Sequence, residues 1–196
     1  MKKSLSLVFI LLTLFLSVAC KQKKKEKPDK ERFFPALSFI KSQVAHIDTS
    51  LYSIRKLVFV DSTKTDTLFV KREQFRELAL DFLLLPDLSD PKYENRFVEK
   101  NSFDTSLNRV ILILEPVEAE KEEIQRQEVL IRPDDTGDKV TSIIIDYLVN
   151  NKDSLVQKRL LWQVDKSFLV TTTRQLPGQP ETITTYKVIW NETSDE

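Results

Sequence analysis

Val110-Ile111-Leu112-Ile113-Leu114 is the stretch that decides the fold, because five consecutive side chains are apolar. Successive side chains of a β-strand point to opposite faces of the sheet, so this run predicts a strand that is apolar on both faces. Ile143-Ile144-Ile145 repeats the pattern further along the chain. We expect both segments to be central strands of a sheet that is covered on both sides.

Further strand-like segments surround these two. From residue 96 onward, seven candidate strands alternate with short polar connections: 96–103, 108–117, 124–132, 139–150, 154–164, 167–175 and 181–190. Tight connections join antiparallel neighbours, so the simplest topology for these segments is an antiparallel meander.

The region before residue 96 has a different pattern. Its apolar residues first recur at steps of three and four, which predicts an amphipathic helix that begins near Pro35; they are Phe33, Leu37, Ile40, Val44, Ile47 and Leu51. Residues 55–60 and 67–71 flank a polar turn and predict a hairpin. Residues 72–85 predict a second helix that ends before Pro86.

The order of these elements predicts an α+β fold for residues 33–196, which we expect to form a single domain. It comprises an N-terminal amphipathic helix, a hairpin, a second helix and then an antiparallel meander of about seven strands. The helices either pack on one face of the sheet, or the sheet curves around a helix.

The N-terminus has the order of an export signal. Lys2 and Lys3 precede an apolar run over residues 5–18, which is shorter than the roughly 20 residues that span a bilayer. The run ends in Leu16-Ser17-Val18-Ala19-Cys20, and Cys20 is the only cysteine of the chain. No intramolecular disulfide can therefore form.

This stretch resembles the lipobox-type signal of bacterial lipoprotein precursors, although Ser17 stands where that family prefers an aliphatic residue. The resemblance implies that the signal peptide, residues 1–19, is removed and that the Cys20 thiol is acylated. The alternative is an ordinary secretory signal that is cut after Ala19 and leaves a free thiol.

Acyl chains on Cys20 would anchor the protein to a membrane surface. By the same resemblance, Lys21 after the cysteine implies transfer to the outer membrane of the bacterial cell envelope, with the protein facing the periplasm. Residues 20–32 form a charged, flexible tether, in which residues 21–32 carry seven basic and three acidic side chains. The tether is either attracted to anionic lipids or serves as a solvated spacer.

Residues 33–196 hold 21 basic and 27 acidic side chains, which argues against a nucleic-acid partner. The chain has one histidine, His46, which we place on the exposed side of the first helix beside Phe39. Its two glycines exclude Gly-rich phosphate loops. Asp134-Asp135-Thr136-Gly137-Asp138 lacks calcium-loop spacing and predicts a hairpin turn. We therefore expect no metal, no cofactor and no catalytic residue.

Two polar regions have alternative interpretations. The acidic run over residues 115–123 is either a solvated connector or a docking surface for a basic partner. Threonines 171–173 and Thr182, Thr184 and Thr185 lie on strands that we expect to pair through the Pro177-Gly178 turn, where threonines opposite one another stabilise a sheet. A polar recognition face is the alternative there.

Residues 71–79 and 158–168 resemble parts of small envelope lipoproteins of unassigned function. The element order alone also resembles the half-barrel periplasmic lipoprotein carriers. No activity follows from these resemblances. The expected anchor, the charged tether and the absence of a recognisable set of catalytic residues favour a non-catalytic interaction or accessory protein that binds another envelope protein.

The alternative function is a carrier or sensor that holds an apolar ligand between sheet and helix. The aromatic residues that could line such a cavity, or form a dry core instead, are Phe103, Trp162, Phe168, Tyr186 and Trp190. A carboxylate-based hydrolase is a third interpretation, which nothing in the sequence localises.

Overall fold

The computed structural model describes residues 33–60 and 63–192. The predicted signal peptide (residues 1–19), Cys20 and the tether (residues 20–32) lie outside the described residues.

Nine strands form one antiparallel sheet in the order β2-β1-β9-β8-β7-β6-β5-β4-β3. Their bounds are β1 Ile54–Phe59, β2 Thr65–Val70, β3 Phe97–Asp104, β4 Arg109–Pro116, β5 Ile124–Arg132, β6 Lys139–Asn150, β7 Leu155–Gln163, β8 Ser167–Gln175 and β9 Thr182–Ile189. The strands from β3 to β9 follow one another as a meander, in agreement with the antiparallel connections expected from the sequence.

The predicted α+β class with a seven-stranded sheet is wrong. Strands hold 47% of the described residues and helices only 20%, so the fold is mainly β. The hairpin of β1 and β2 does not stand apart from the meander, because β1 pairs with β9 along Arg55–Phe59 and extends the sheet by two strands. This pairing joins segments more than 120 residues apart, which local sequence patterns do not specify.

Helix α2 spans Ala36–Thr49, close to its predicted position. The predicted second helix, in contrast, is broken into the 3₁₀ turn η1 (Arg72–Gln74), α3 (Phe75–Leu78) and α4 (Leu80–Leu83). The break falls at Ala79, whose φ of −87° and ψ of 3° depart from helical values. Helices this short depend on tertiary packing, so their apolar spacing alone could not predict continuity.

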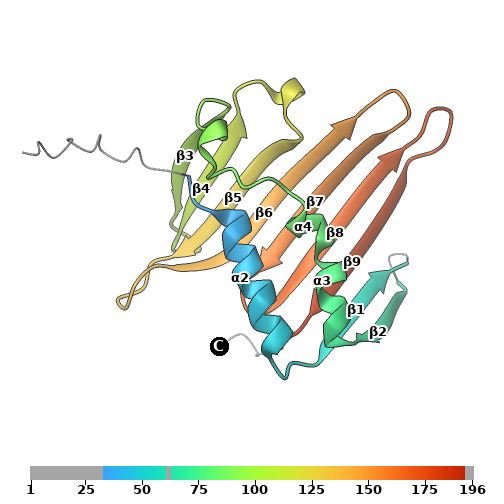
Figure 1. Ribbon diagram of the computed structural model, residues 1–196, viewed down its shortest axis with the longest axis horizontal. Coiled ribbons are helices and arrows are strands. Elements are labelled where there is room, and N and C mark those ends of the chain that lie inside the picture. The colour runs from blue at the N-terminus through green and yellow to red at the C-terminus, as the bar shows by residue number, and fades with distance from the viewer. Residues whose placement is uncertain (1–32, 61–62, 193–196) are drawn as a thin grey trace, which may run out of the picture. The chain divides into compact units, whose positions relative to one another are not determined.

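Helices α2, α3 and α4 lie on one side of the sheet (Figure 1), which we call the inner face. The apolar stripe of α2 is buried there together with Phe75 and Phe82 from α3 and α4. Side chains from the middle strands complete this core; they are Leu114, Val129, Ile143, Ile145, Leu160, Trp162, Phe168, Val170 and Val188. The core therefore lies between the helices and one face of the sheet.

The opposite side, which we call the outer face, has no α-helix over it in the described part of the chain (Figure 1). The prediction that the two apolar runs are covered on both sides is therefore wrong for this side. Ile111, Ile113 and Ile144 alternate with inner-face residues and remain partly exposed on the outer face. Apolar character on both faces does not by itself specify what covers each face.

Helix α2 receives its N-terminal cap from a distant loop. Its own flanking residue, Pro35, makes no side-chain cap. Instead, Asp87 Oδ2 accepts hydrogen bonds from Ser38 N at 3.1 Å and from Ser38 Oγ at 2.7 Å. Burial raises the pKa of Asp87, but the hydrogen bonds from Ser38 and Ser89 outweigh it and lower the pKa. A carboxylate at this helix end is also favoured by the helix dipole.

Two predicted turns are confirmed by their backbone geometry. Gly137, between β5 and β6, has φ of +126°, and Gly178, between β8 and β9, has φ of +72°. Both angles lie in the region that glycine adopts at no steric cost. The turn at residues 134–138 is held by its own side chains, since Asp134 accepts from Thr136 and pairs with Lys139 at 2.7 Å.

Candidate functional site

Three of the five aromatic residues considered for a ligand cavity are packed against other aromatic rings. Trp162, Phe168 and Trp190 are at most 3% exposed. The Trp162 and Phe168 rings stack with centroids 5.4 Å apart, and Phe75 and Phe82 contact them from the helices at 5.9 Å and 5.2–5.3 Å. The protein's own side chains thus fill the space that an apolar ligand would need here.

Trp162 carries a buried polar atom within this cluster. Its Nε1 has no hydrogen-bond partner among the described residues. The Phe82 ring lies 5.2 Å away at an angle of 79°, an edge-to-face arrangement. Weak contacts of an N–H with an aromatic face can offset part of the cost of such burial. The cluster is therefore a packed core with one polar atom that lacks a conventional partner.

Tyr186 connects the sheet to the broken helix. Its hydroxyl donates to Asp81 Oδ2 at 3.1 Å or to Leu78 O at 3.2 Å. Lys158 Nζ lies 2.5 Å from Asp81 Oδ1, so one carboxylate has a partner on each side. Burial, followed by the charge of Asp81, raises the pKa of Tyr186 well above 10. This network attaches α4 to the inner face and contains no pair of converging carboxylates.

Phe103 lies apart from the other four aromatic residues. It stands on the edge strand β3, is 54% exposed and is not a member of the core cluster. The sequence grouped it with the others because all five fall on predicted strands. Their separation in space depends on strand order, which places β3 at one edge and β7–β9 towards the other.

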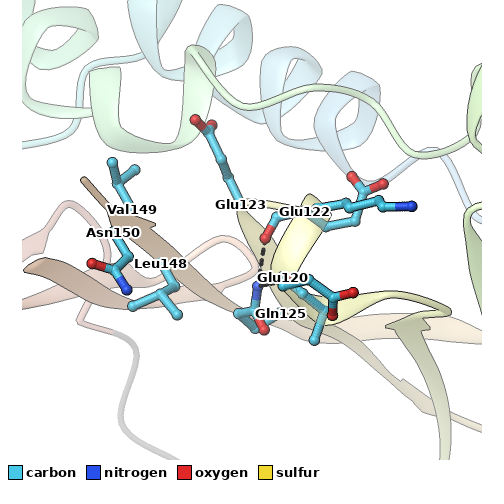
Figure 2. Close-up of a pocket in the computed structure, with 9 residues that line it drawn as sticks. Glu120, Glu122, Glu123, Gln125, Leu148, Val149 and Asn150 are labelled. Carbon is cyan, nitrogen blue, oxygen red and sulfur yellow. Dashed lines mark hydrogen bonds between the residues drawn. The ribbon is translucent and has the colours of Figure 1, made fainter. Parts of the chain in front are cut away.

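The acidic run forms a surface hollow of about 440 Å³ beside Leu148–Asn150 of β6 (Figure 2). Its carboxylates do not converge: Glu120, Glu122 and Glu123 point in different directions in Figure 2. Glu122 forms a two-pronged ion pair with Arg96 at 2.6 and 2.7 Å. The Tyr147 hydroxyl donates to Glu123 at 2.9 Å, and burial and this contact raise the pKa of Tyr147 to about 12. The run is therefore partly ordered by ion pairs and hydrogen bonds.

The other polar residues considered in the sequence analysis do not come together into one site. His46 is exposed and lies 6.4 Å from Tyr52, while Phe39 contacts Phe34 at 5.8 Å. Thr185 Oγ1 and Thr171 Oγ1 are 3.3 Å apart across β8 and β9, which agrees with the predicted cross-strand pairing. In residues 33–60 and 63–192, no group of three or more His, Cys, Asp or Glu side chains could hold a metal ion.

The outer face carries an apolar patch, and the sequence analysis expected three of its residues, Ile111, Ile113 and Ile144, to be covered. The strand register places Leu169, Leu161 and Ile144 side by side across β8, β7 and β6. The patch continues on β5 and β4; we define this outer patch as Ile111, Ile113, Leu130, Ile144, Leu161 and Leu169. All six side chains are partly exposed, whereas their inner-face neighbours in the middle strands are buried.

Ion pairs border the outer patch and also interrupt it, because the register places Glu128 between Ile113 and Ile144. Arg126 contacts Glu128 at 2.6 Å and Glu115 at 2.9 Å, and Lys100 contacts Glu115 at 2.5 Å. The hydrogen bond and the charge of Lys100 lower the pKa of Glu115. Arg159 and Asp146 form a longer pair at 3.7 Å on β7 and β6. Partly exposed apolar side chains bordered by charged residues are typical of protein–protein contact surfaces.

The chain matches no protein-family model, no curated protein sequence and no solved structure. Among the described residues, no helix combines the length and the apolar character needed to cross a membrane. The outer patch is the feature that sequence interpretation missed. A signal for it was present, since the apolar residues at 111, 113 and 144 do not follow the alternation of a sheet with one solvated face.

Proposed function

We propose that this chain is a non-catalytic accessory lipoprotein of the bacterial cell envelope, anchored through lipid on Cys20 and facing the periplasm. Its outer patch contacts the apolar surface of another envelope protein. The observation that carries the proposal is a sheet face that no α-helix of the described residues covers, on which six isoleucine and leucine side chains are partly exposed on neighbouring strands. Burying such side chains against a partner stabilises a complex by about 25 cal/mol per Å² of apolar surface removed from water.

One further feature supports this proposal over the carrier of an apolar ligand, and another supports it over the hydrolase. The aromatic residues between helices and sheet contact one another, so a ligand there would have to displace ring contacts of 5.2–5.9 Å. Ion pairs hold Glu115, Glu128 and Asp134 against Lys100, Arg126 and Lys139. This pairing disfavours the use of these carboxylates as the acid or base of a hydrolase.

The membrane anchor can be tested on the intact chain in bacterial cells. We expect the wild-type chain to take up labelled fatty acid and to fractionate with membranes. Cys20→Ala should lose both properties, because no other thiol is present. Fatty-acid labelling that persists in Cys20→Ala, or a wild-type chain found only in the soluble fraction, would contradict the anchor.

The partner contact can be tested by site-specific photo-crosslinking in the intact envelope. A photoreactive residue at Leu161 should give one discrete protein adduct, and the same residue at the exposed Lys41 of α2 should not. Leu169→Glu, beside residue 161 on the outer face, should abolish the adduct. Thr184→Glu, an exposed position whose register places it on the inner side, should leave the adduct intact. An adduct that survives Leu169→Glu argues against the patch as the contact.

A further inference from the structure

The outer face also has a basic hollow at the end of the strands, separate from the outer patch. It has a volume of about 760 Å³, within the size range of ligand pockets. Four cationic side chains line it, Arg109, Arg132, Lys139 and Lys166, against one carboxylate, Asp165. This local excess of positive charge contrasts with the acidic balance of residues 33–196.

The strand register brings three of these cations into one row. Arg132 on β5 pairs with Lys139 on β6. Arg109 on β4 lies one position beyond the Val110–Ile131 pair and therefore faces Arg132. Like charges opposite one another on a sheet face destabilise the fold. The row therefore has an electrostatic cost to the fold.

Neither arginine has a side-chain partner among the described residues. Lys139 is paired with Asp134 at 2.7 Å, but no carboxylate in the described ranges forms an ion pair with Arg109 or Arg132. Asp104, which pairs with Arg109 in the ladder, accepts instead from the backbone N–H groups of Ser106 and Leu107. Arg109 Nε is moreover buried without a hydrogen-bond partner. Buried donors nearly always have a hydrogen-bond acceptor, so a buried donor without one among the described residues is an exception.

Neutral donors complete the lining. Gln163 Oε1 accepts from Ser167 Oγ at 2.7 Å, which leaves the amide nitrogen of Gln163 as a donor. The hydroxyl groups of Thr141 and Ser142 belong to the same lining, although Thr141 Oγ1 donates to Leu130 O. Two guanidinium groups, an amide and a hydroxyl suit an oxygen-rich anion, because guanidinium forks match the geometry of phosphate oxygens.

We propose that this hollow binds a phosphate group through Arg109 and Arg132. The phosphate belongs either to a small soluble molecule or to a lipid headgroup. Its negative charge would relieve the repulsion between the two arginines, and its oxygens would accept hydrogen bonds from their guanidinium groups. The site is independent of the protein partner proposed above, since no residue of the outer patch lines it.

The first test uses the purified full-length chain in detergent and inorganic phosphate as the probe. Binding is measured by titration calorimetry, and thermal unfolding is followed in phosphate and in chloride at equal ionic strength. We expect phosphate to raise the Tm of the wild-type chain above its value in chloride. Arg132→Gln and Arg109→Gln should each weaken phosphate binding about tenfold, the scale of one lost charge-assisted interaction, and should remove the phosphate-specific rise in Tm.

The control is Arg174→Gln, which removes the same charge from an exposed arginine of β8 outside the hollow. It should bind phosphate as the wild type does. Loss of binding to the same degree in Arg174→Gln would overturn the proposal, because the effect would then depend on net charge alone. A variant that is destabilised equally in both salts yet binds phosphate normally would overturn the proposal as well.

A second arm distinguishes the two sources of phosphate. The full-length chain with Cys20→Ala, which lacks the proposed acyl chains, and its arginine variants are floated with phosphatidylcholine vesicles that contain or lack phosphatidylglycerol. Arginine-dependent binding to the phosphatidylglycerol vesicles assigns the site to a lipid headgroup. Arginine-dependent binding of inorganic phosphate alone assigns it to a soluble phosphate compound. If neither probe depends on Arg109 or Arg132, the hollow is not a phosphate site.

Discussion

Leu160 and Leu161 are neighbours on β7, yet they belong to opposite faces of the sheet. Leu160 is fully buried beneath the helices, whereas Leu161 lies partly exposed in the outer patch. The inner face is stabilised by aromatic stacking, helix packing and the Asp81 network. The outer face combines apolar side chains with ion pairs and with two arginines, Arg109 and Arg132, that form no ion pair among the described residues. The same residue type thus stabilises the fold on one face and remains available for binding on the other.

The largest expected effect compares these two leucines directly. Leu160→Ala should lower the free energy of unfolding by about 2–5 kcal/mol, the range for leucine truncation in a packed core. Leu161→Ala should lower it by about 1 kcal/mol or less, since water already reaches part of the side chain. Urea unfolding followed by tryptophan fluorescence measures both changes. Equal losses would show that the outer face is covered in solution.

The second effect concerns the cap that the inner-face helix receives from Asp87. Asp87→Ala should destabilise the chain by about 1–2 kcal/mol at pH 7, because α2 loses both its cap and a favourable charge. The lowered pKa of Asp87 means that this stabilisation is present above pH 3.8 and is lost as the pH falls below it.

Urea unfolding at pH 7 and at pH 3 tests the direction of this pH dependence. The difference between wild type and Asp87→Ala should shrink at the lower pH. Asp153→Ala, on an exposed turn without a side-chain partner, is the matched control and should change stability little at either pH.

The third effect tests how firmly the broken helix is attached to the inner face. Tyr186→Phe should cost about 1 kcal/mol, since it removes a partly buried hydroxyl that bonds Asp81 or Leu78. Tyr147→Phe removes a hydroxyl that bonds the exposed Glu123 and should cost less than about 0.5 kcal/mol. Thermal unfolding by circular dichroism compares the two variants. A larger loss of stability in Tyr147→Phe than in Tyr186→Phe would show that the contact with Glu123 is the stronger of the two.

The smallest effect is expected for the ion pairs of the outer face. Arg159→Gln breaks the 3.7 Å pair with Asp146, and exposed pairs contribute about 0–1 kcal/mol. We expect a change below about 0.5 kcal/mol that disappears in 1 M salt, where charges are screened beyond about 3 Å. Urea unfolding at low and high salt measures it. A loss of stability that does not depend on salt would indicate that the aliphatic part of Arg159 contributes through packing.

Sequence interpretation succeeded where structure depends on neighbouring residues. The predicted bounds of β5, β6 and β8 agree with the structure, and the turns at Gly137 and Gly178 have the backbone angles that favour glycine. The candidate site was predicted less well. Three of the five aromatic residues proposed around a ligand lie in one packed core, and Phe103 lies at a distant edge. The arginine row was not predicted at all, because it depends on the register of three strands.

The amino-acid sequence by itself determined where strands, turns and helix α2 lie, because apolar spacing and turn chemistry act over a few residues. Only the tertiary structure decided that β1 joins β9, that α2, α3 and α4 cover one face, and that Arg109 stands opposite Arg132. Those features depend on contacts between segments far apart in the chain, and a side chain's alternation along one strand does not reveal which face another element will cover. The outer face, which carries both proposed sites, is therefore a property of the folded sheet.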